Sequence, residues 1–455
     1  MPTKPTVKTL SNSSVDIMNA IRNSASTNYR DYVPIATKDA SSIRAIGEII
    51  MDNPQLQNEF LSALVNRIGR VLVTSKLYDN PLRMFKQGFL EFGESIEEIF
   101  VNISKAHTFD PEVAEEKVWA REIPDVRSAF HIMNYQKYYK QTVSDDQLRQ
   151  AFLSWDGVTD LISKIVEAIY TANNYDEFLV TKYLLAKNIL NGRVKANEIP
   201  AISASNMKTI VSTVKETMNN MTFLNSVYNV AGVMNQTPIT DQFIILNTKF
   251  DAVMDVEVLA SAFNMDKASF MGQRLVIDGF GNLDMARLNE LFADDPWFTP
   301  ITEAECEALN AIPCVVVSRD YFMIFDNMQK FTEVYNGEGL YWNYWYHVWK
   351  TFSVSPFAQA TLFIPETVAI TSVSVTPKEA SVVAGQSLQM SAVVEAEGFD
   401  SKVVDWTVDD TTNASITASG LLEISKDAPS QTVITVTATS HVDSTKSDTA
   451  TITVA

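Results

Sequence analysis

Residues 339–349 read GLYWNYWYHVW, an aromatic run that follows directly on a turn signal. The pair Asn336-Gly337 favours a tight hairpin between the segment Phe331–Tyr335 and the longer run Leu340–Val354. Aromatic side chains occupy both sets of alternating positions in the second run, so both faces of this strand are expected to be covered. One face is expected to pack on a helix of the same chain and the other on a partner. A platform that stacks a ligand is the alternative.

The longest helical pattern starts at Ser144, which is followed by two aspartates and by Gln147 at the capping-box position. Apolar side chains then recur at spacings of three and four residues, and this stripe consists of Leu148, Phe152, Trp155, Val158, Ile162, Ile165 and Ile169. Asn173-Asn174 is a candidate interruption, and Asn191-Gly192 is a fitting C-terminal stop. A helix of this length needs a platform on which to lie.

The N-terminal part of the chain is less regular. Residues 1 to about 39 are polar, with one amphipathic stretch around Val15–Ile21, and predict an extended arm. Helical spacing follows over Ile43–Ile68, with a break at Asn53-Pro54. Val71–Thr142 has β-like runs around an acidic middle and too little periodicity for its own core. A two-stranded projection that packs on neighbouring subunits would explain this range, and a small irregular α+β subdomain is the alternative.

The middle of the chain alternates between the two periodicities. Helices are expected over Ser203–Met221 and Val256–Phe263. Short continuous apolar runs predict covered strands, and these runs are Phe243–Leu246, Arg274–Ile277, Cys314–Val317 and Tyr321–Phe325. This alternation indicates a mixed α/β core.

The composition changes at Pro365, after which Val, Thr, Ser and Ala dominate. Seven short alternating runs follow, which predict an immunoglobulin-like β-sandwich with Trp406 as its core aromatic residue between the sheets. They are Val373–Val375, Leu388–Val394, Val403–Val408, Ser415–Ile416, Leu421–Ile424, Val433–Thr439 and Ala450–Val454. This part of the chain contains only four lysines but twelve acidic residues. An acidic sandwich on a flexible junction at Pro365 is more typical of a surface decoration than of a wall.

Charge and motifs exclude several functional classes. The formal net charge is −19, with 36 Lys and Arg against 55 Asp and Glu, which argues against direct binding to nucleic acid or anionic lipid. The chain has no P-loop, dinucleotide-binding glycine fingerprint, nucleophile elbow or zinc-helix motif, so we expect no catalytic residue and no cofactor. Acidic pairs such as Glu97-Glu98 and Glu115-Glu116 are expected on solvated faces or in interfaces.

Metal, disulfide and membrane sites are not expected either. The four histidines are far apart in the sequence, at His107, His131, His347 and His441. Cys306 and Cys314 are the only cysteines, which indicates folding in a reducing cytoplasm without a disulfide framework. The first residues carry lysines without a following apolar run, and no stretch is long enough to span a membrane, so a soluble protein is expected.

Certain stretches are distinctive in their order along the chain. They are Asp16–Ser24 (DIMNAIRNS), Ile96–Ile99 (IEEI), Leu259–Met265 (LASAFNM), Val276–Phe280 (VIDGF) and the aromatic run Gly339–Trp349. Over nearly its whole length the chain resembles the major head protein of small short-tailed phages with protein-primed DNA genomes, whose best-known member infects Bacillus. Val404-Asp405-Trp406 followed by Gly420-Leu421-Leu422 resembles the group 2 bacterial immunoglobulin-like domain.

The resemblance implies an α+β fold of the Hong Kong 97 capsid type followed by an all-β immunoglobulin-like sandwich. The expected division is an N-terminal arm with the first helices (1–70), an extended loop (71–142), a spine helix with the peripheral domain (143–198), an axial domain (199–330), return strands of the peripheral domain (331–364) and the immunoglobulin-like domain (365–455). Residues 191–236 and 282–311 are the least family-like.

The function that this resemblance implies is self-assembly. Copies would form hexamers and pentamers of an icosahedral or prolate head that encloses double-stranded DNA without reading its sequence, with the immunoglobulin-like domain displayed outside. Implied partners are a scaffolding protein, a portal or connector at one vertex, and a head fibre or host glycans at the immunoglobulin-like domain. The protein would be made in the bacterial cytoplasm and reside in the virion capsid.

Two other classes remain as alternatives. A cell-surface adhesin with a terminal immunoglobulin-like module would carry a signal peptide or a wall anchor. A carbohydrate-active enzyme would carry a carboxylate pair lined by aromatic residues, for which Trp342, Trp345 and Trp349 are the best platform.

Overall fold

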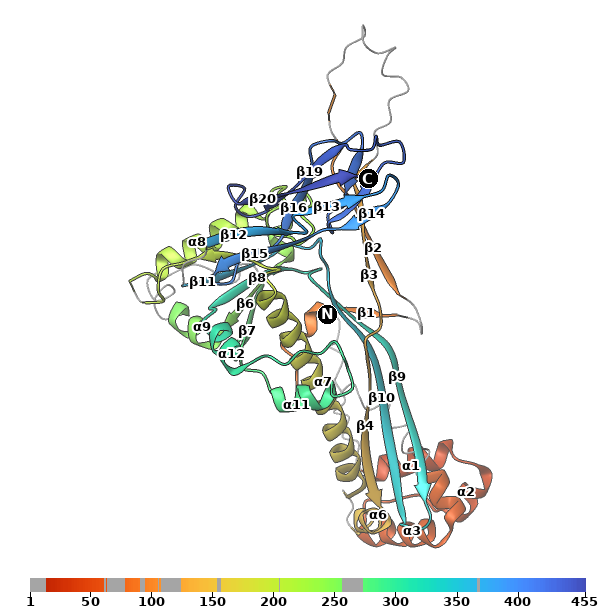
Figure 1. Ribbon diagram of the computed structural model, residues 1–455. Coiled ribbons are helices and arrows are strands. Elements are labelled where there is room, and N and C mark those ends of the chain that lie inside the picture. Colours follow the sequence, from red (N-terminus) through yellow and green to blue (C-terminus); the bar gives the residue numbers. More distant parts are fainter. Residues whose placement is uncertain are drawn as a thin grey trace.

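The computed structural model describes residues 14–60, 63, 78–90, 95–104, 106–107, 124–153, 157–203, 205–255, 273–365 and 369–455. The molecule is elongated (Figure 1): N-terminal helices lie at one end, a β-sandwich lies at the other, and a second sheet with its helices branches off to one side. A long sheet and a long helix connect these parts.

The aromatic run is a strand of that long sheet, as predicted. β10 (Tyr341–Val354) pairs antiparallel with β9 (Phe322–Asn336) on one side and with β4 (Tyr135–Ser144) on the other, and β1 (Lys86–Phe89) pairs parallel with β9. The expected strands Tyr321–Phe325 and Phe331–Tyr335 are thus parts of one continuous strand, β9. The polar residues between them stay in the strand because the sheet pairs them: Asp326 with Lys86, and Asn327 with Thr351.

The long helix α7 (Gly157–Leu190) lies along this sheet. Ser144 is an N-cap with a complete capping box, as predicted, but it caps the separate short helix α6 (Asp145–Ala151). Asn173-Asn174 does not interrupt α7, because both side chains have partners: Asn173 accepts from Lys350, and Asn174 donates to the carbonyl of Tyr78. The expected stop is confirmed, since α7 ends before Gly192, which has a left-handed φ of +63°.

The N-terminal residues differ from the expected extended arm. α1 (Ser14–Ser24), α2 (Thr27–Tyr32) and α3 (Ala40–Asp52) are helices, and a further helix includes 54–60. The amphipathic stretch of α1 is buried, with Ile17 and Ile21 in the same core as Phe152 and Tyr346. Its apolar side chains find a cover on the far end of the long sheet, so a helix is favoured over an arm. Residues 1–13 lie outside the described part.

A second sheet has the strand order β5 (Lys195–Glu198), β11 (Ala360–Ile364), β8 (Cys314–Ser318), β6 (Gln242–Asn247) and β7 (Gln273–Ile277). Helices α8 (Met207–Asn220) and α9 (Thr248–Met254) contribute to the core on one face, and the end of α7 with α11 (Met285–Leu291) and α12 (Glu303–Asn310) contributes to the other. The covered strands predicted at Phe243–Leu246 and Cys314–Val317 are confirmed, since every residue of β6 and of β8 is buried. Arg274–Ile277 forms a strand as predicted, but it was wrongly expected to be covered: β7 is at the edge of the sheet, and of its residues only Ile277 is buried. Of the expected helix Val256–Phe263, no residue is described.

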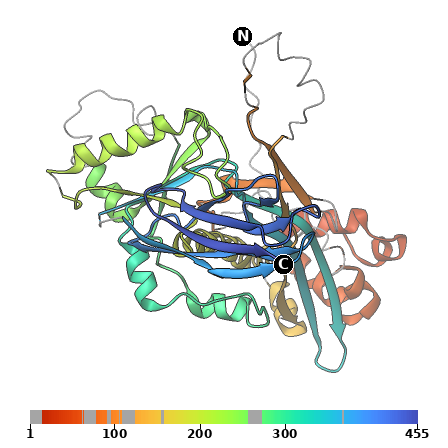
Figure 2. The same ribbon diagram turned by 45° about the horizontal axis from the view of Figure 1, so that its top comes forward.

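The C-terminal part is a β-sandwich, as predicted, and Figure 2 shows its strands lying across the end of the molecule. Its strands are β12 (Ala369–Thr376), β13 (Glu379–Val382), β14 (Ser387–Gln389), β15 (Ser391–Glu397), β16 (Val404–Val408), β17 (Ala414–Ile416), β18 (Leu421–Ile424), β19 (Val433–Ser440) and β20 (Ser447–Val454). The expected strand 388–394 is split at Met390, whose amide donates to Gly420 instead. Trp406 is only half-buried at the edge of a core built mainly from β18, β19 and β20.

Candidate functional site

A two-stranded hairpin projects beside the long sheet. It consists of β2 (Ile96–Val101) and β3 (Val126–His131), paired antiparallel from Ile96 opposite His131 to Val101 opposite Val126. The projection was predicted over Val71–Thr142, but the described hairpin is shorter than this range. Two other strands of the range, β1 and β4, belong to the long sheet. Residues 108–123, between the two hairpin strands, lie outside the described residues, and Glu115-Glu116 with them.

One face of the hairpin is exposed and mainly apolar, with Glu97 and Ser128 as its polar residues. Successive side chains alternate between the two faces, so every second residue of each strand points outward. Ile99 and Phe130 are 59% and 64% exposed. The other exposed apolar side chains of the strands and their ends are Val101, Ile103, Val126 and Ile132. We call these six residues the apolar face. Contiguous exposed apolar side chains of this kind mark contact surfaces, since water contact with them is unfavourable.

The opposite face of the hairpin is attached to the body of the protein. Phe100 stacks on Phe357, with ring centroids 5.6 Å apart. His131 is buried, with Nδ1 2.8 Å from Ser353 Oγ and Nε2 3.2 Å from Glu98 Oε2. The hydroxyl of Ser355 donates to Glu98 Oε1 over 2.8 Å. The hairpin therefore starts from a polar and aromatic base that orients the apolar face.

Glu98 was expected in an acidic pair on a solvated face or in an interface. It lies in an intramolecular contact with His131 and Ser355, while its neighbour Glu97 is exposed on the outer side. The alternation of the two strands separates the pair onto opposite faces, so the two carboxylates cannot work as an acid–base dyad.

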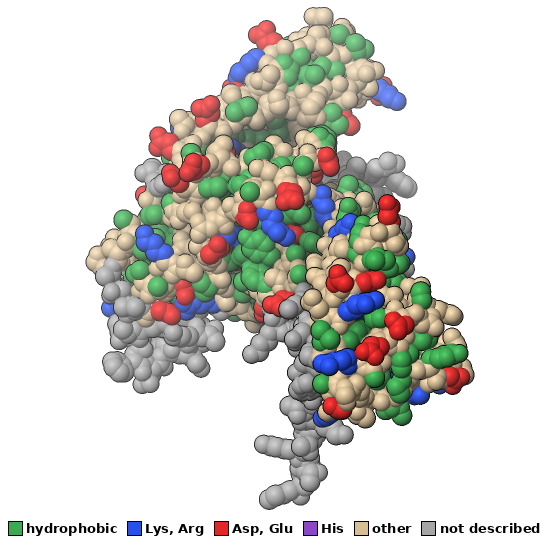
Figure 3. All heavy atoms as spheres, turned by 90° about the horizontal axis from the view of Figure 1, so that it is seen from below, with side chains coloured by type: hydrophobic (Ala, Val, Ile, Leu, Met, Phe, Trp, Pro, Cys, Tyr) green, Lys and Arg blue, Asp and Glu red, His purple; other side chains and the backbone are tan. Residues whose placement is uncertain are grey.

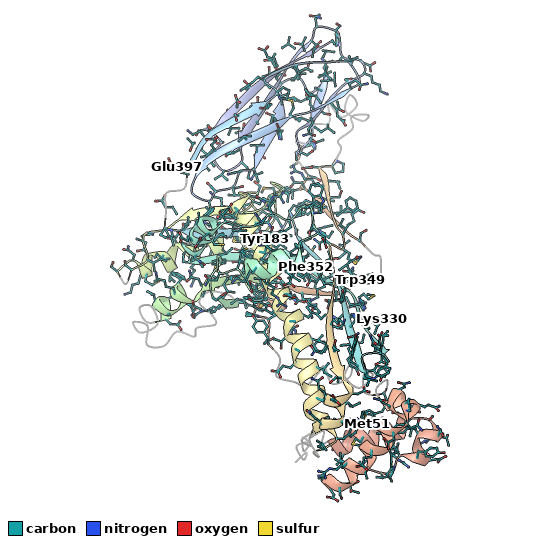
Figure 4. The ribbon with its side chains drawn as sticks, turned by 60° about the horizontal axis from the view of Figure 1, so that its bottom comes forward. Met51, Tyr183, Lys330, Trp349, Phe352 and Glu397 are labelled. Carbon is teal, nitrogen blue, oxygen red and sulfur yellow. The ribbon has the colours of Figure 1, made fainter. Side chains whose placement is uncertain are left out.

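One face of β10 packs on helices of the same chain, as predicted. Trp342, Tyr344 and Tyr346 are buried in the core with α1, α3 and α7. Trp345 and Trp349 point to the other side and are half-buried. Figure 4 places Trp349 on the long sheet between Phe352 and Lys330. The three tryptophans of the suggested ligand platform are thus divided between the two faces, since Trp342 lies opposite to the other two.

The remaining candidate ligands do not converge within the described part of the chain. No group of three or more His, Cys, Asp or Glu side chains is placed there to hold a metal ion. His347 contacts Thr332, and His441 contacts Asp405. Both cysteines are free; burial raises the pKa of the Cys306 thiol. None of the helices that the structure describes is long and apolar enough to cross a membrane.

The charged side chains on the described surface are mixed in sign. Figure 3 shows the molecule from below, where acidic and basic side chains alternate with apolar ones over the N-terminal helices. This face has no large basic area, in agreement with the net charge of −19. This arrangement offers an apolar contact surface on the hairpin, which is held to the body by Phe100, His131 and Glu98.

Sequence reasoning anticipated the hairpin but not its apolar face. The sequence signal was weak, because neither strand alternates strictly between polar and apolar residues: 96–101 reads IEEIFV and 126–132 reads VRSAFHI. Both faces of β2 contain apolar residues, since Phe100 points inward and Ile99 outward. The contacts of Phe100 with Phe357 and of His131 with Ser353 reveal which face the body of the protein covers.

Comparison with known proteins gives a consistent picture. Residues 18–364 match the model of the "Phi29-like phage major capsid protein" family, and residues 369–454 match "Bacterial Ig-like domain (group 2)". The chain is 38% identical to the major capsid protein of Bacillus phage B103 over 93% of this chain and 90% of the relative, and 37% identical to that of Bacillus phage PZA with the same coverage. In fold it is similar to a chain in the capsid structure of Staphylococcus phage Andhra, with a TM-score of 0.51 and 15% identity over 65% of this chain and 86% of that one.

Proposed function

Because the chain belongs to the Phi29-like phage major capsid protein family, we propose that the apolar face of the β2–β3 hairpin is a surface by which one copy packs on the next in the shell. The protein is a phage major capsid protein, a structural protein of the virion capsid. Its fold is the Hong Kong 97 type with a C-terminal immunoglobulin-like domain. The adhesin and carbohydrate-active alternatives are not favoured, since the capsid family covers 18–364.

The observation that carries the proposal is the asymmetry of the hairpin. One face is attached to the body through Phe100, His131 and Glu98, and the opposite face exposes six apolar side chains. Full burial of one such side chain contributes roughly 1.5–3 kcal/mol. A closed shell contains many copies, and the contact recurs at each of them. A modest affinity per contact therefore gives high collective stability.

We also propose the partners of the shell and the way in which it encloses the genome, from the same membership of the capsid family. Hexamers and pentamers would form the shell, a scaffolding protein would guide its curvature, and a portal would occupy one vertex. The acidic chain would enclose double-stranded DNA without adhering to it, since attraction to the wall would impede filling. The immunoglobulin-like domain would lie on the outer surface, available to a fibre or to glycans. The protein would act without catalysis or a cofactor.

The test is assembly of the full chain, co-expressed with its scaffolding partner and imaged by cryo electron microscopy. Ile99→Asn and Phe130→Asn should leave the circular dichroism spectrum unchanged, because both side chains are exposed in the single chain. Loss of about 1.4 kcal/mol per contact lowers each contact affinity about tenfold, so closed shells should become rare. Val383→Asn is the matched control, since Val383 is also 59% exposed but lies in the immunoglobulin-like domain.

Normal shells from Ile99→Asn and Phe130→Asn at the wild-type protein concentration would overturn the role of the apolar face. The same reconstruction of wild-type shells tests the placement of the C-terminal sandwich. Density for this domain inside the shell would contradict its proposed position.

A further inference from the structure

The immunoglobulin-like domain contacts the body of the protein through one end of its sandwich. Two loops form this end: 398–403, between β15 and β16, and 441–446, between β19 and β20. The backbone joins them, because the amide of His441 donates to the carbonyl of Val403. Figure 4 shows Glu397, the last residue of β15, at the end of the sandwich that faces the body of the protein.

The loop 398–403 is attached to the end of the spine helix and to the second sheet. The amide of Lys402 donates to the carbonyl of Gly192 over 2.7 Å. Asp400 is 3% exposed, accepts from the amide of Ala196 over 3.2 Å, and lies 3.7 Å from the ammonium of Lys195. Phe399 packs on the core beneath the same sheet. These buried contacts give the domain a defined seat on the body of the protein.

The loop 441–446 is attached to a different part of the body, residues 222–236, which we call the bridging segment. His441 has an 8% exposed side chain. Its Nε2 lies 2.7 Å from the carbonyl oxygen of Ser226, and its Nδ1 lies 2.7 Å from Asp405 Oδ2. Gly232 also lies under the ring: a Cβ there would be 3.3 Å from its Cε1.

The bridging segment also holds the base of the hairpin. The guanidinium of Arg127 on β3 donates to the carbonyl of Ala231, next to Gly232. The amide of Met234 donates to Asn102, just after β2. The immunoglobulin-like domain therefore contacts the bridging segment at Ser226 and Gly232. The hairpin contacts the same segment a few residues away, at Ala231 and Met234.

The segment itself has no helix or strand of its own in this range beyond one bridge, Asn225 with Asn235. It rests on the link between β10 and β11: the amide of Ala231 donates to the carbonyl of Pro356, and Asn235 donates to that of Phe357. Segments with few internal backbone bonds open locally at low free energy unless neighbours hold them. Both Ser226 and Ala231 depend on such neighbours.

We infer that the immunoglobulin-like domain has a second function as an intramolecular clamp: through His441 and the bridging segment it fixes the base of the hairpin. This goes beyond display on the shell surface. It rests on the proposed function only for what the hairpin does in a shell, because the clamp itself is a property of the single chain. A fixed base lowers the entropy lost when the hairpin packs on a neighbour, so the clamp favours assembly.

Hydrogen–deuterium exchange of the unassembled full chain tests the clamp. His441→Ala removes the contacts with Ser226 and Gly232. We expect faster exchange, by several-fold, in the bridging segment and in β2–β3, with exchange in the cores of β19 and β20 unchanged. Lys378→Ala is the control, since it removes an exposed ion pair with Asp448 and leaves the loops 398–403 and 441–446 intact.

Arg127→Ala tests the same connection from the opposite side. Coupling through a shared segment is reciprocal, so exchange should also rise in the loop 441–446. A rise confined to 441–446 in His441→Ala, or the same exchange in the hairpin as in Lys378→Ala, would overturn the clamp. Failure of the assembly test with a normal exchange result would instead contradict the proposed role of the apolar face alone.

Discussion

The ammonium group of Lys350 lies 2.5 Å from a carboxylate oxygen of Glu177, and their side chains are 1% and 5% exposed. Lys350 lies on β10 at a β-bulge, and Glu177 lies on the spine helix α7. Asn173 accepts a second bond from Lys350 at 3.0 Å, and Lys86 reaches the same carboxylate at 3.2 Å. Asp326 pairs with Lys86, so two positive and two negative groups are balanced between helix and sheet.

Glu177→Gln should strongly destabilise the helix–sheet unit. The substitution leaves Lys350 buried without its counter-charge, and removal of one partner from a buried pair costs about 3–5 kcal/mol. Urea unfolding monitored by tryptophan fluorescence measures the loss. Glu167→Gln, at an exposed position of the same helix, is the control and should change the free energy of unfolding by less than about 0.5 kcal/mol. Equal effects of the two substitutions would refute this account.

Gly192→Ala should loosen the seat of the immunoglobulin-like domain. Gly192 has φ +63°, and a Cβ there would lie 2.6 Å from Lys402 Cγ and 2.8 Å from the carbonyl oxygen of Asp400. Strain and close approach together predict a loss of about 1–3 kcal/mol and greater protease sensitivity between the two domains. Gly337→Ala is the control, because a Cβ there meets nothing nearer than 3.8 Å. An unchanged cleavage rate in Gly192→Ala would count against the seat.

The contact of His441 with the bridging segment should depend on pH. The hydrogen bond with Asp405 raises the pKa of His441 above its ordinary value of 6.5, against burial and the nearby positive charge of Arg127. Only the cationic ring donates from both nitrogens, to Asp405 and to Ser226. The stabilisation is therefore complete below the ordinary pKa and is lost as pH rises through the raised pKa.

Hydrogen exchange in the bridging segment, corrected for the intrinsic pH dependence of exchange, measures this effect. The protection of the wild type relative to His441→Gln should be largest below pH 6.5 and should shrink as pH rises through the raised pKa of His441. Protection that grows with pH would reverse the expected sign.

His131→Ala should release the hairpin from its base. The ring connects Ser353 and Glu98, and its loss leaves Glu98 without one of its two partners. We expect faster exchange in β2 and β3 and fewer closed shells, with unfolding of the immunoglobulin-like domain unaffected. Lys378→Ala, in an exposed ion pair of the immunoglobulin-like domain, provides the comparison. If both variants assemble like the wild type, the base does not orient the apolar face.

The sequence predicted correctly those turns, caps and strands that depend on a few consecutive residues. The hairpin turn at Asn336-Gly337, the capping box at Ser144 and the stop at Gly192 all depend on a few consecutive residues, and the structure has all three. The covered strands β6 and β8 were also predicted, because a continuous apolar run has few stable environments other than a sheet covered on both faces.

Other expectations were wrong because a distant partner decides the outcome. The polar residues Asp326 and Asn327 gave no strand signal, yet β9 continues through them because Lys86 and Thr351 pair with them. Val15–Ile21 was assigned to an extended arm, but the end of the long sheet covers it as a helix. Asn173-Asn174 did not interrupt α7 because Lys350 and Tyr78 satisfy both side chains.

The sequence by itself determined the class of fold, the sandwich that begins after Pro365 and the resemblance to a capsid family, because periodicity, turn residues and motifs are properties of adjacent residues. Only the tertiary structure decided which face of β2–β3 is exposed, and that His441 and Arg127 contact the same bridging segment. Those relationships join residues that are more than a hundred positions apart. Burial and partner choice depend on the packing of the whole chain, which no local pattern contains.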